Sequence, residues 1–158
     1  MDDDERRRPP SLLSAIAALL VLPGTIAVVV PLVILRDDLA ARRIAPEGVI
    51  VLILGGVVVL WCVRDFFVTG RGTLAPWSPP RRLVRVGLYR RSRNPMYVGV
   101  LLTVAGWAIG FRSLALAAYA LILAMAFHLR VVLGEEPWLA RTHGAAWEEY
   151  RSRVPRWL

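Results

Sequence analysis

Four long apolar segments constrain what this chain can fold into more than any other feature of its sequence. Hydrophobic residues make up 56% of the 158 residues, and they are concentrated in these segments, which charged stretches separate. A helix rises about 1.5 Å per residue and the hydrocarbon core is about 30 Å thick, so one crossing takes roughly 20 residues. The pattern predicts an all-α polytopic membrane protein with about four transmembrane helices. The segments are Ser11–Leu35, Gly48–Val63 (with a possible continuation to Val68), Met96–Phe111 and Ser113–Leu133.

The first apolar segment carries prolines that affect its path. It is long enough to cross once with tilt, and Pro23-Gly24 lies near its middle and Pro31 near its end. Because proline removes a backbone donor and bends a helix, we expect one kinked helix here, with a re-entrant hairpin as the alternative. The small-x-small triplet Ala15-Ile16-Ala17 lies at the start of the apolar run, where signal-peptide cleavage is not expected. We therefore expect an uncleaved first membrane helix.

The other apolar segments are shorter, and their boundaries indicate how they pack. The second and third are short for a full crossing, but flanking arginines can snorkel and a bilayer can thin locally. The turn between the third and fourth segments is essentially Arg112, so these two should form an antiparallel hairpin. Gly99, Gly106 and Gly110 offer flat surfaces for close contact between helices.

The distribution of arginine indicates the orientation in the membrane. All 20 basic residues are arginine, and with four crossings 16 of them lie on the side of the N-terminus, the second loop and the C-terminal tail. The positive-inside rule makes that side cytoplasmic. Anionic lipid beside the spans explains the net charge of +8, so nucleic-acid binding is not expected. Arginine without lysine is typical of a GC-rich bacterial genome, which favours a bacterial inner membrane.

Residues suited to chemistry gather in the second half of the chain. The single cysteine, Cys62, lies in an apolar segment and no metal-ligand pair accompanies it, so we expect no metal site. A basic stretch, residues 71–93, leads into Arg93-Asn94-Pro95-Met96-Tyr97. Pro95 suits the first turn of a helix and Asn94 suits its N-cap. Alone, these features indicate a basic loop on anionic lipid followed by a well-made helix start.

The fourth apolar segment ends in polar groups. His128 and Arg130 lie near its end, and Glu135-Glu136 follows. Such groups are costly in a membrane unless they reach the interface or a polar cavity, although the cations can snorkel and the glutamates can form an acidic helix N-terminus. Beyond them we expect an amphipathic interfacial helix. One face would hold Leu139, His143, Trp147 and Tyr150, and the other Arg141, Glu148 and Glu149.

Taken in order, these motifs resemble those of the isoprenylcysteine carboxyl methyltransferase family, which belongs with the phospholipid methyltransferases. The resemblance covers roughly residues 81–157, about half of the chain. Two positions depart from the family pattern: Asn94 stands where histidine is frequent, and His143 where an aromatic residue is frequent. The motifs are Gly87-Leu88-Tyr89, Arg93-Asn94-Pro95-Met96-Tyr97-Val98-Gly99, Glu135-Glu136-x-x-Leu139, His143-Gly144, Tyr150 and Val154-Pro155-Arg156.

The resemblance implies an S-adenosylmethionine-dependent methyltransferase whose acceptor is a lipid-like or prenylated small molecule. It implies one domain over residues 1–158, with membrane helices in 1–70 and a cofactor-binding catalytic half in 71–158. The catalytic candidates are Arg130, which would hold an anionic substrate, Glu135 and His128. The candidate cofactor-binding residues are Arg81, Arg82, Leu83, Val84, Tyr89, Arg93, Asn94, Pro95, Met96, Tyr97, Gly99, Glu135 and Glu136.

Several functions remain open at this point. A carboxylate acceptor is favoured because it is already ionised at neutral pH and needs no general base. A phospholipid or other amine is the alternative acceptor, and it would have to lose a proton to His128 or a glutamate. An NADPH-dependent membrane reductase of the sterol type and a non-enzymatic membrane protein are further alternatives. By the same resemblance, either Glu135 or Glu136 would bind the polar end of the cofactor.

Overall fold

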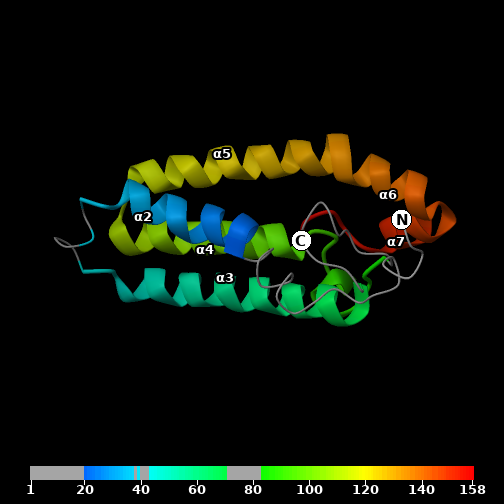
Figure 1. Ribbon diagram of the computed structural model, residues 1–158, viewed down its shortest axis with the longest axis horizontal. Coiled ribbons are helices and arrows are strands. Elements are labelled where there is room, and N and C mark those ends of the chain that lie inside the picture. Colours follow the sequence, from blue (N-terminus) through cyan, green and yellow to red (C-terminus); the bar gives the residue numbers. More distant parts are fainter. Residues whose placement is uncertain (1–19, 38, 40–42, 71–82) are drawn as a thin grey trace, which may run out of the picture.

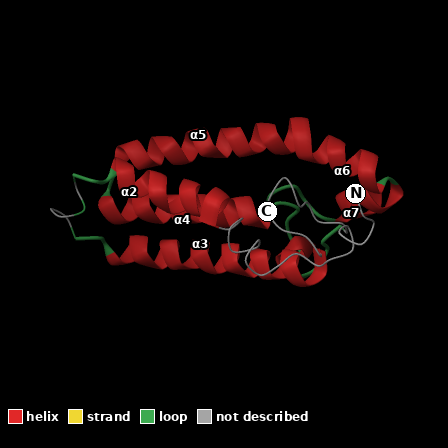
Figure 2. Ribbon diagram, in the orientation of Figure 1, coloured by secondary structure: helices red, strands yellow, loops and turns green. Residues whose placement is uncertain are grey.

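The computed structural model describes residues 20–37, 39, 43–70 and 83–158, and every regular element in them is helical (Figure 2). The prediction of an all-α fold is confirmed for this part of the chain. The long helices lie side by side in an elongated bundle, with α4 between α3 and α5 (Figure 1). The elements are η2 (Leu20–Val29), α2 (Val30–Ile34), α3 (Pro46–Asp65), η3 (Phe66–Gly70), η4 (Gly87–Arg90), α4 (Pro95–Phe111), α5 (Leu114–Arg130), η5 (Val131–Glu135), α6 (Glu136–His143) and α7 (Ala145–Arg153).

Among the described residues, two helical stretches are long and apolar enough to cross a membrane. They are Pro46–Thr69, with 24 residues, and Leu114–His143, with 30. Pro23–Ile34 and Pro95–Phe111 are shorter apolar helices. The outer faces of α3 and α5 suit lipid better than water, because large apolar side chains are exposed along them. These include Ile50, Ile53, Leu54, Leu121, Ile122 and Met125.

Glycines bring α3 and α4 into backbone contact. A Cβ added to Gly106 would lie 2.5 Å from the backbone nitrogen of Leu52, and one added to Gly48 would meet the backbone of Gly110. A Cβ on Gly55 would meet the backbone of Thr103 in the same way. The predicted close contact of the α4 glycines is therefore confirmed, and its partner is α3. Small residues allow this approach without a side-chain clash.

The predicted hairpin of α4 and α5 is also confirmed. Arg112 adopts a left-handed conformation, with φ 49°, directly after α4 ends. Ser113 is the N-cap of α5, and its hydroxyl accepts a hydrogen bond from the backbone N–H of Leu116 at 3.4 Å. Two residues therefore reverse the chain between neighbouring helices.

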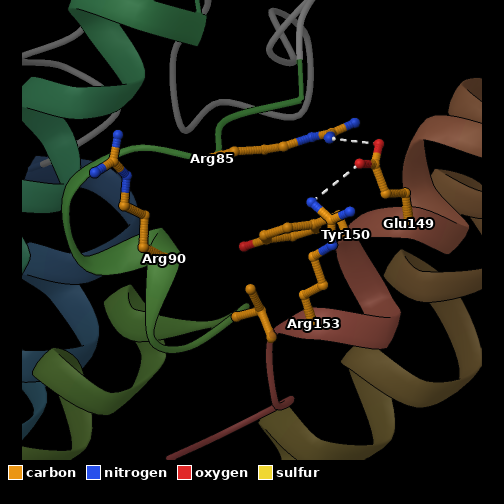
Figure 3. A pocket seen from close by; sticks show the side chains of 6 residues that line it. Arg85, Arg90, Glu149, Tyr150 and Arg153 are labelled. Carbon is orange, nitrogen blue, oxygen red and sulfur yellow. Dashed lines mark hydrogen bonds and ion pairs between the residues drawn. The ribbon is translucent and has the colours of Figure 1, made fainter.

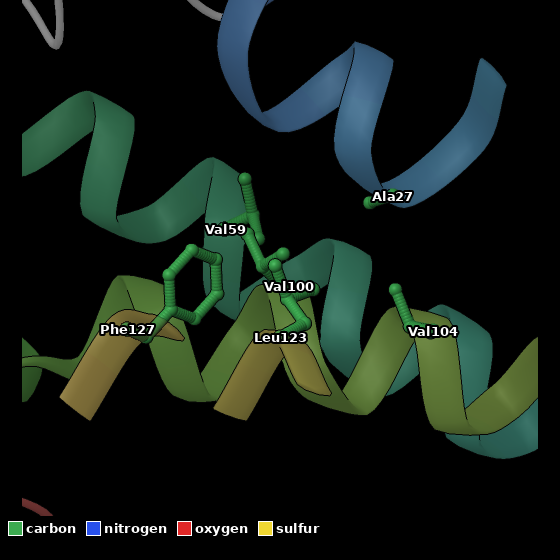
Figure 4. Packing of buried hydrophobic residues seen from close by; sticks show 6 residues of the cluster. All are labelled: Ala27, Val59, Val100, Val104, Leu123 and Phe127. Carbon is green, nitrogen blue, oxygen red and sulfur yellow. The ribbon is translucent and has the colours of Figure 1, made fainter. Parts of the chain in front are cut away.

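One apolar core joins all four long helices of the bundle. It contains Ala27 from the first helix, Val59 from α3, Val104 from α4 and Phe127 from α5 (Figure 4). Val100 and Leu123 complete the buried cluster. Residues on both sides of residue 70 thus pack into the same core.

The first helix docks through two backbone carbonyls near Pro31. The indole N–H of Trp107 donates to the carbonyl of Ala27 at 3.0 Å, and the hydroxyl of Tyr119 donates to that of Ile26 at 3.1 Å. Pro31 lies four residues beyond Ala27 and five beyond Ile26, which are the spacings of α- and π-helical hydrogen bonds. Because proline has no N–H, side chains of α4 and α5 supply donors to these carbonyls.

The expected proline distortion takes the form of a π-helix. The wide helix η2 contains Pro23, and helical backbone continues through it into α2. In residues 20–34, therefore, no hairpin turn interrupts the chain. Residues 11–19 of the first apolar segment lie outside the described residues.

The prediction of a single amphipathic helix after the fourth apolar segment is wrong. Helical structure continues from α5 through η5 into α6, and it stops at Gly144, where φ is +50° and ψ is −125°. A residue with a side chain rarely adopts this conformation, so glycine permits the chain to fold back into α7. Trp147 and Tyr150 then pack against Leu139 inside the protein. The expected common face is divided between two helices.

Candidate functional site

The candidate site lies at the end of the bundle where α3 and α5 finish and α4 begins (Figure 1). Pro95 occupies the first turn of α4, as predicted. Asn94 occupies the N-cap position, but its side chain does not cap the helix. Its amide nitrogen instead donates to the carbonyl of Arg156 at 3.0 Å, and the backbone N–H of Arg93 donates to that of Pro155 at 2.9 Å. The end of the chain is thereby tied to the start of α4, which corrects the capping prediction.

Tyr97, Arg130 and Glu135 form the central cluster of this site. The hydroxyl of Tyr97 donates to Oε1 of Glu135. Nε of Arg130 lies 2.8 Å from the same carboxylate oxygen and 3.1 Å from the Tyr97 hydroxyl. One carboxylate oxygen therefore receives two donors from two different helices.

The wide turn η5 explains how Arg130 and Glu135 meet. The two residues are five positions apart, which on a regular α-helix would place them on different faces. A π-helix has i→i+5 hydrogen bonds, so residues five apart lie close to one line along its surface. η5 covers Val131–Glu135, so it begins directly after Arg130 and ends at Glu135. The local helix geometry thus assembles the ion pair.

The central cluster is supported on one side and accessible on the other. The ring of Tyr97 packs against that of Phe127, with centroids 4.3 Å apart. The side chain of Glu135 is 33% exposed and that of Arg130 is 61% exposed. Within the described residues, Oε2 of Glu135 and both terminal nitrogens of Arg130 have no hydrogen-bond partner. An acceptor and two donors are therefore available to a ligand.

The neighbouring Glu136 has a different environment. Arg156 binds it with two hydrogen bonds, of 2.8 and 2.9 Å, in the forked geometry that a guanidinium makes with a carboxylate. Nη1 of Arg93 lies 3.1 Å from Oε1 of Glu136, and these two side chains are only 9% and 13% exposed. Of the two glutamates, Glu135 is thus the accessible one, and Glu136 joins the chain end to the start of α4.

Arg93 is a buried cation with spare donors. Its guanidinium lies over the ring of Trp147, 5.4 Å from the centroid, and burial lowers the pKa of Arg93 from its usual value. Nε is buried and makes no hydrogen bond in the part of the chain that the structure describes, and the buried Nη1 has only the ion pair with Glu136. Buried donors without acceptors are costly, so a ligand that supplied an acceptor here would stabilise the site.

Other residues of the predicted cofactor set pack inside the protein. Tyr89 is buried beside Cys62 and Val84, and its carbonyl accepts a hydrogen bond of 2.7 Å from the hydroxyl of Tyr150. Burial raises the pKa of Tyr89 well above its ordinary value. Met96 packs against the same group. A ligand role for these residues stays a prediction.

The other residues predicted to bind the cofactor or to act in catalysis lie apart from the central cluster. Gly99 faces Val58 and Val59 of α3, and Leu83 packs against the cluster of Trp147 and Tyr150. His128 is exposed, and its ring stacks with that of Trp157 at 6.2 Å. No hydrogen bond joins His128 to Arg130 or Glu135 among the described residues. Arg81 and Arg82 lie outside the described residues.

The structure adds residues that were not proposed as site residues. Arg156 neutralises Glu136, Trp147 covers Arg93, and Phe127 supports Tyr97. The sequence could have identified Arg156 as a site residue, because it belongs to the Val154-Pro155-Arg156 motif. Phe127 and Trp147 have no signal in their local sequence for these contacts.

An apolar helical bundle with two helices long enough to cross a membrane and a polar cluster at one end is typical of an integral-membrane protein. The family model described as phospholipid methyltransferase matches residues 44–146. The chain belongs to the phospholipid methyltransferase family. The matched region runs from the start of α3 into α7 and includes Tyr97, Arg130 and Glu135. No curated protein and no solved structure matches the chain. The family supports a membrane methyltransferase.

Proposed function

We propose that this protein transfers a methyl group from S-adenosylmethionine to an amphiphilic substrate in the membrane. The observation that carries the proposal is the cluster of Tyr97, Arg130 and Glu135, which combines an aromatic wall, a cation and an accessible carboxylate at one end of the apolar bundle. The chain's membership of the phospholipid methyltransferase family supports the same function.

The residues present fit S-adenosylmethionine. The cofactor carries an ammonium group, a carboxylate and a sulfonium, and it supplies an electrophilic methyl group. The free oxygen of Glu135 suits the ammonium, and the ring of Tyr97 suits a cation. The buried Nε of Arg93, which makes no hydrogen bond within the described residues, suits the carboxylate. We propose these residues as the binding set and assign Glu136 to positioning Arg93.

The favoured acceptor is the carboxylate of an amphiphile, as in isoprenylcysteine carboxyl methyltransferases. In the reaction the carbon–sulfur bond breaks, a carbon–oxygen bond forms, and the opposite charges of sulfonium and carboxylate disappear together. A carboxylate needs no general base at neutral pH. The two free terminal nitrogens of Arg130 would orient it. This chain's contribution is then alignment and exclusion of water.

An amine acceptor, such as an aminophospholipid, is the second candidate, and the description of the matching family favours it. A protonated amine must lose a proton before it attacks the methyl group. Glu135 is the accessible carboxylate of the cluster and would receive that proton. The two candidates therefore differ in whether Glu135 has a proton-transfer role.

We further propose four crossings with the candidate site on the cytoplasmic side. α4 has only 17 residues, but glycine contacts along its length hold it against α3, one of the two candidate spans. It would therefore cross the same apolar layer. The excess of arginine at the candidate-site end supports the orientation. The shared core supports one domain over residues 1–158, with the cofactor-binding half in 71–158.

Calorimetry with the detergent-solubilised protein and S-adenosylmethionine tests the cofactor. Glu135→Gln removes the charge but keeps the shape, and we expect binding to weaken about tenfold or more. Glu148→Gln is the matched control, because Glu148 pairs with Arg151 on the exposed surface of α7. Failure of the unmodified protein to bind, or equal effects of the two variants, would contradict the proposal. Binding of NADPH instead would favour a reductase.

Labelled cofactor distinguishes the acceptors. Membranes that contain the protein would be incubated with S-adenosylmethionine carrying a labelled methyl group, and the labelled lipid fraction would be treated with base. We expect the label to be released as volatile methanol, because base hydrolyses a methyl ester. Label that stays non-volatile after this treatment would overturn the carboxylate assignment in favour of an N-methyl product.

A further inference from the structure

A second group of charged residues surrounds a cavity between η4 and α7 (Figure 3). The cavity has a volume of about 300 Å³. None of its lining residues belongs to the cluster of Tyr97, Arg130 and Glu135, so methyl transfer as proposed does not use it. The lining residues are Arg85, Arg90, Glu149, Tyr150, Arg153 and Val154.

The cavity is positively charged, and its one carboxylate is already engaged. Oε2 of Glu149 lies 3.5 Å from Nη1 of Arg85, and Oε1 lies 3.1 Å from Nη1 of Arg153. No ion pair joins Arg90 to another residue in the described part of the chain. The lining therefore contains three arginines and one glutamate, which give it a net charge of about +2.

Hydrogen bonds hold this lining in place. The hydroxyl of Tyr150 donates to the carbonyl of Tyr89, and Nη2 of Arg85 donates to the carbonyl of Ala146 at 2.7 Å. Arg85 also lies over the ring of Tyr150, 5.8 Å from the centroid. The face of the ring is thus taken by a cation of the protein. The two groups of the lining that could attract the ammonium group of a ligand, Tyr150 and Glu149, thus already interact with guanidinium groups of the protein.

The cavity lies next to the end of a candidate span. Gly87, the first residue of η4, has φ +55°, and a Cβ at this position would meet the carboxylate of Asp65. Asp65 is the last residue of α3, so η4 packs directly against the end of that helix. If α3 crosses the bilayer, the neighbouring cavity lies at the level of the lipid headgroups.

We propose that this cavity binds the phosphate of an anionic phospholipid headgroup and discriminates against zwitterionic headgroups. Guanidinium groups match phosphate oxygens in charge and in forked geometry, and basic pockets beside membrane helices suit such headgroups. A zwitterionic headgroup brings an ammonium whose only carboxylate partner in the lining, Glu149, is already paired with Arg85 and Arg153. The proposal requires the membrane placement of α3 but not the methyltransferase activity.

Native mass spectrometry of the detergent-solubilised full chain tests this site with phosphatidylglycerol and phosphatidylcholine as probes. We expect one tightly bound phosphatidylglycerol and weaker binding of phosphatidylcholine. Arg90→Ala should weaken phosphatidylglycerol about fivefold, the effect of one arginine near an anionic surface. Arg141→Ala is the matched control, because Arg141 is exposed on α6 and does not line the cavity. Circular dichroism would verify that both variants are folded.

A second variant tests the discrimination between headgroups. Arg153→Ala frees one oxygen of Glu149, so the preference for phosphatidylglycerol over phosphatidylcholine should decrease. Equal effects of Arg90→Ala and Arg141→Ala, or equal binding of the two lipids by the unmodified protein, would overturn the proposal. Displacement of the lipid by inorganic phosphate at the same concentration, but not by chloride, would show a site for free phosphate and also overturn the lipid assignment.

Discussion

Trp107→Phe removes the indole N–H that reaches the carbonyl of Ala27, where Pro31 supplies no backbone donor. Leaving a buried carbonyl unpaired costs about 1–3 kcal/mol, whereas side-chain hydrogen bonds in a membrane protein average about 0.6 kcal/mol. Ala27 is buried in the core, and phenylalanine can retain the stacking on Phe111, whose ring centroid lies 6.0 Å away. We therefore expect a loss of about 1 kcal/mol in the free energy of unfolding.

A second substitution isolates the hydrogen bond from packing. Pro31→Ala restores a backbone N–H four residues beyond Ala27, so the carbonyl gains a helical partner and no longer depends on Trp107. In this background Trp107→Phe should cost about half as much or less, which a double-mutant cycle measures as coupling. Unfolding of the four proteins in mixed micelles, followed by circular dichroism, provides the free energies. Equal costs of Trp107→Phe in both backgrounds would refute the assignment of this bond to the missing donor of Pro31.

Two further predictions concern the helix contact and the alkaline stability. Gly106→Ala places a Cβ against the backbone of Leu52 and should lower the free energy of unfolding by about 1–3 kcal/mol, whereas Gly56→Ala, with open space around it, should cause no loss in the same unfolding assay. Burial raises the pKa of Tyr150 to about 12 from the ordinary value of 10, so the folded protein keeps the phenol protonated after the unfolded chain has lost that proton. The contribution of Tyr150 to the free energy of unfolding is therefore complete below pH 10 and is lost as the pH rises towards 12. Tyr150→Phe should reduce this loss when unfolding is measured across that interval.

Much of the fold was predictable because hydropathy and turn chemistry are local. The apolar segment from Met96 to Phe111 predicted α4, and the single residue Arg112 between two apolar runs predicted the hairpin. The sequence predicted one separate interfacial helix after Leu133, whereas the helix of the fourth segment continues through η5 into α6. Hydrophobic periodicity locates a helical face, but it does not show that Gly144 reverses the chain and buries that face inside the protein.

The candidate site was likewise predictable from the sequence only in part. The order of its motifs predicted the family, and a clustering of Tyr97 with the Glu135-Glu136 pair followed from that resemblance. The adjacent sequence positions of Glu135 and Glu136 do not indicate that the two side chains have different environments. These environments depend on the wide turn η5, which directs Glu135 to Arg130, and on the return of the chain end.

The sequence by itself determined that the chain forms apolar helices with a basic, motif-bearing end, because segment length, hydropathy and arginine position are properties of the chain alone. Only the tertiary structure decided which groups remain accessible there. Arg156 lies twenty positions from Glu136 and reaches it only because α7 folds back, and pairing with that arginine and Arg93 buries the carboxylate. Glu135 remains open to a ligand because its partners, Tyr97 and Arg130, occupy one of its two oxygens.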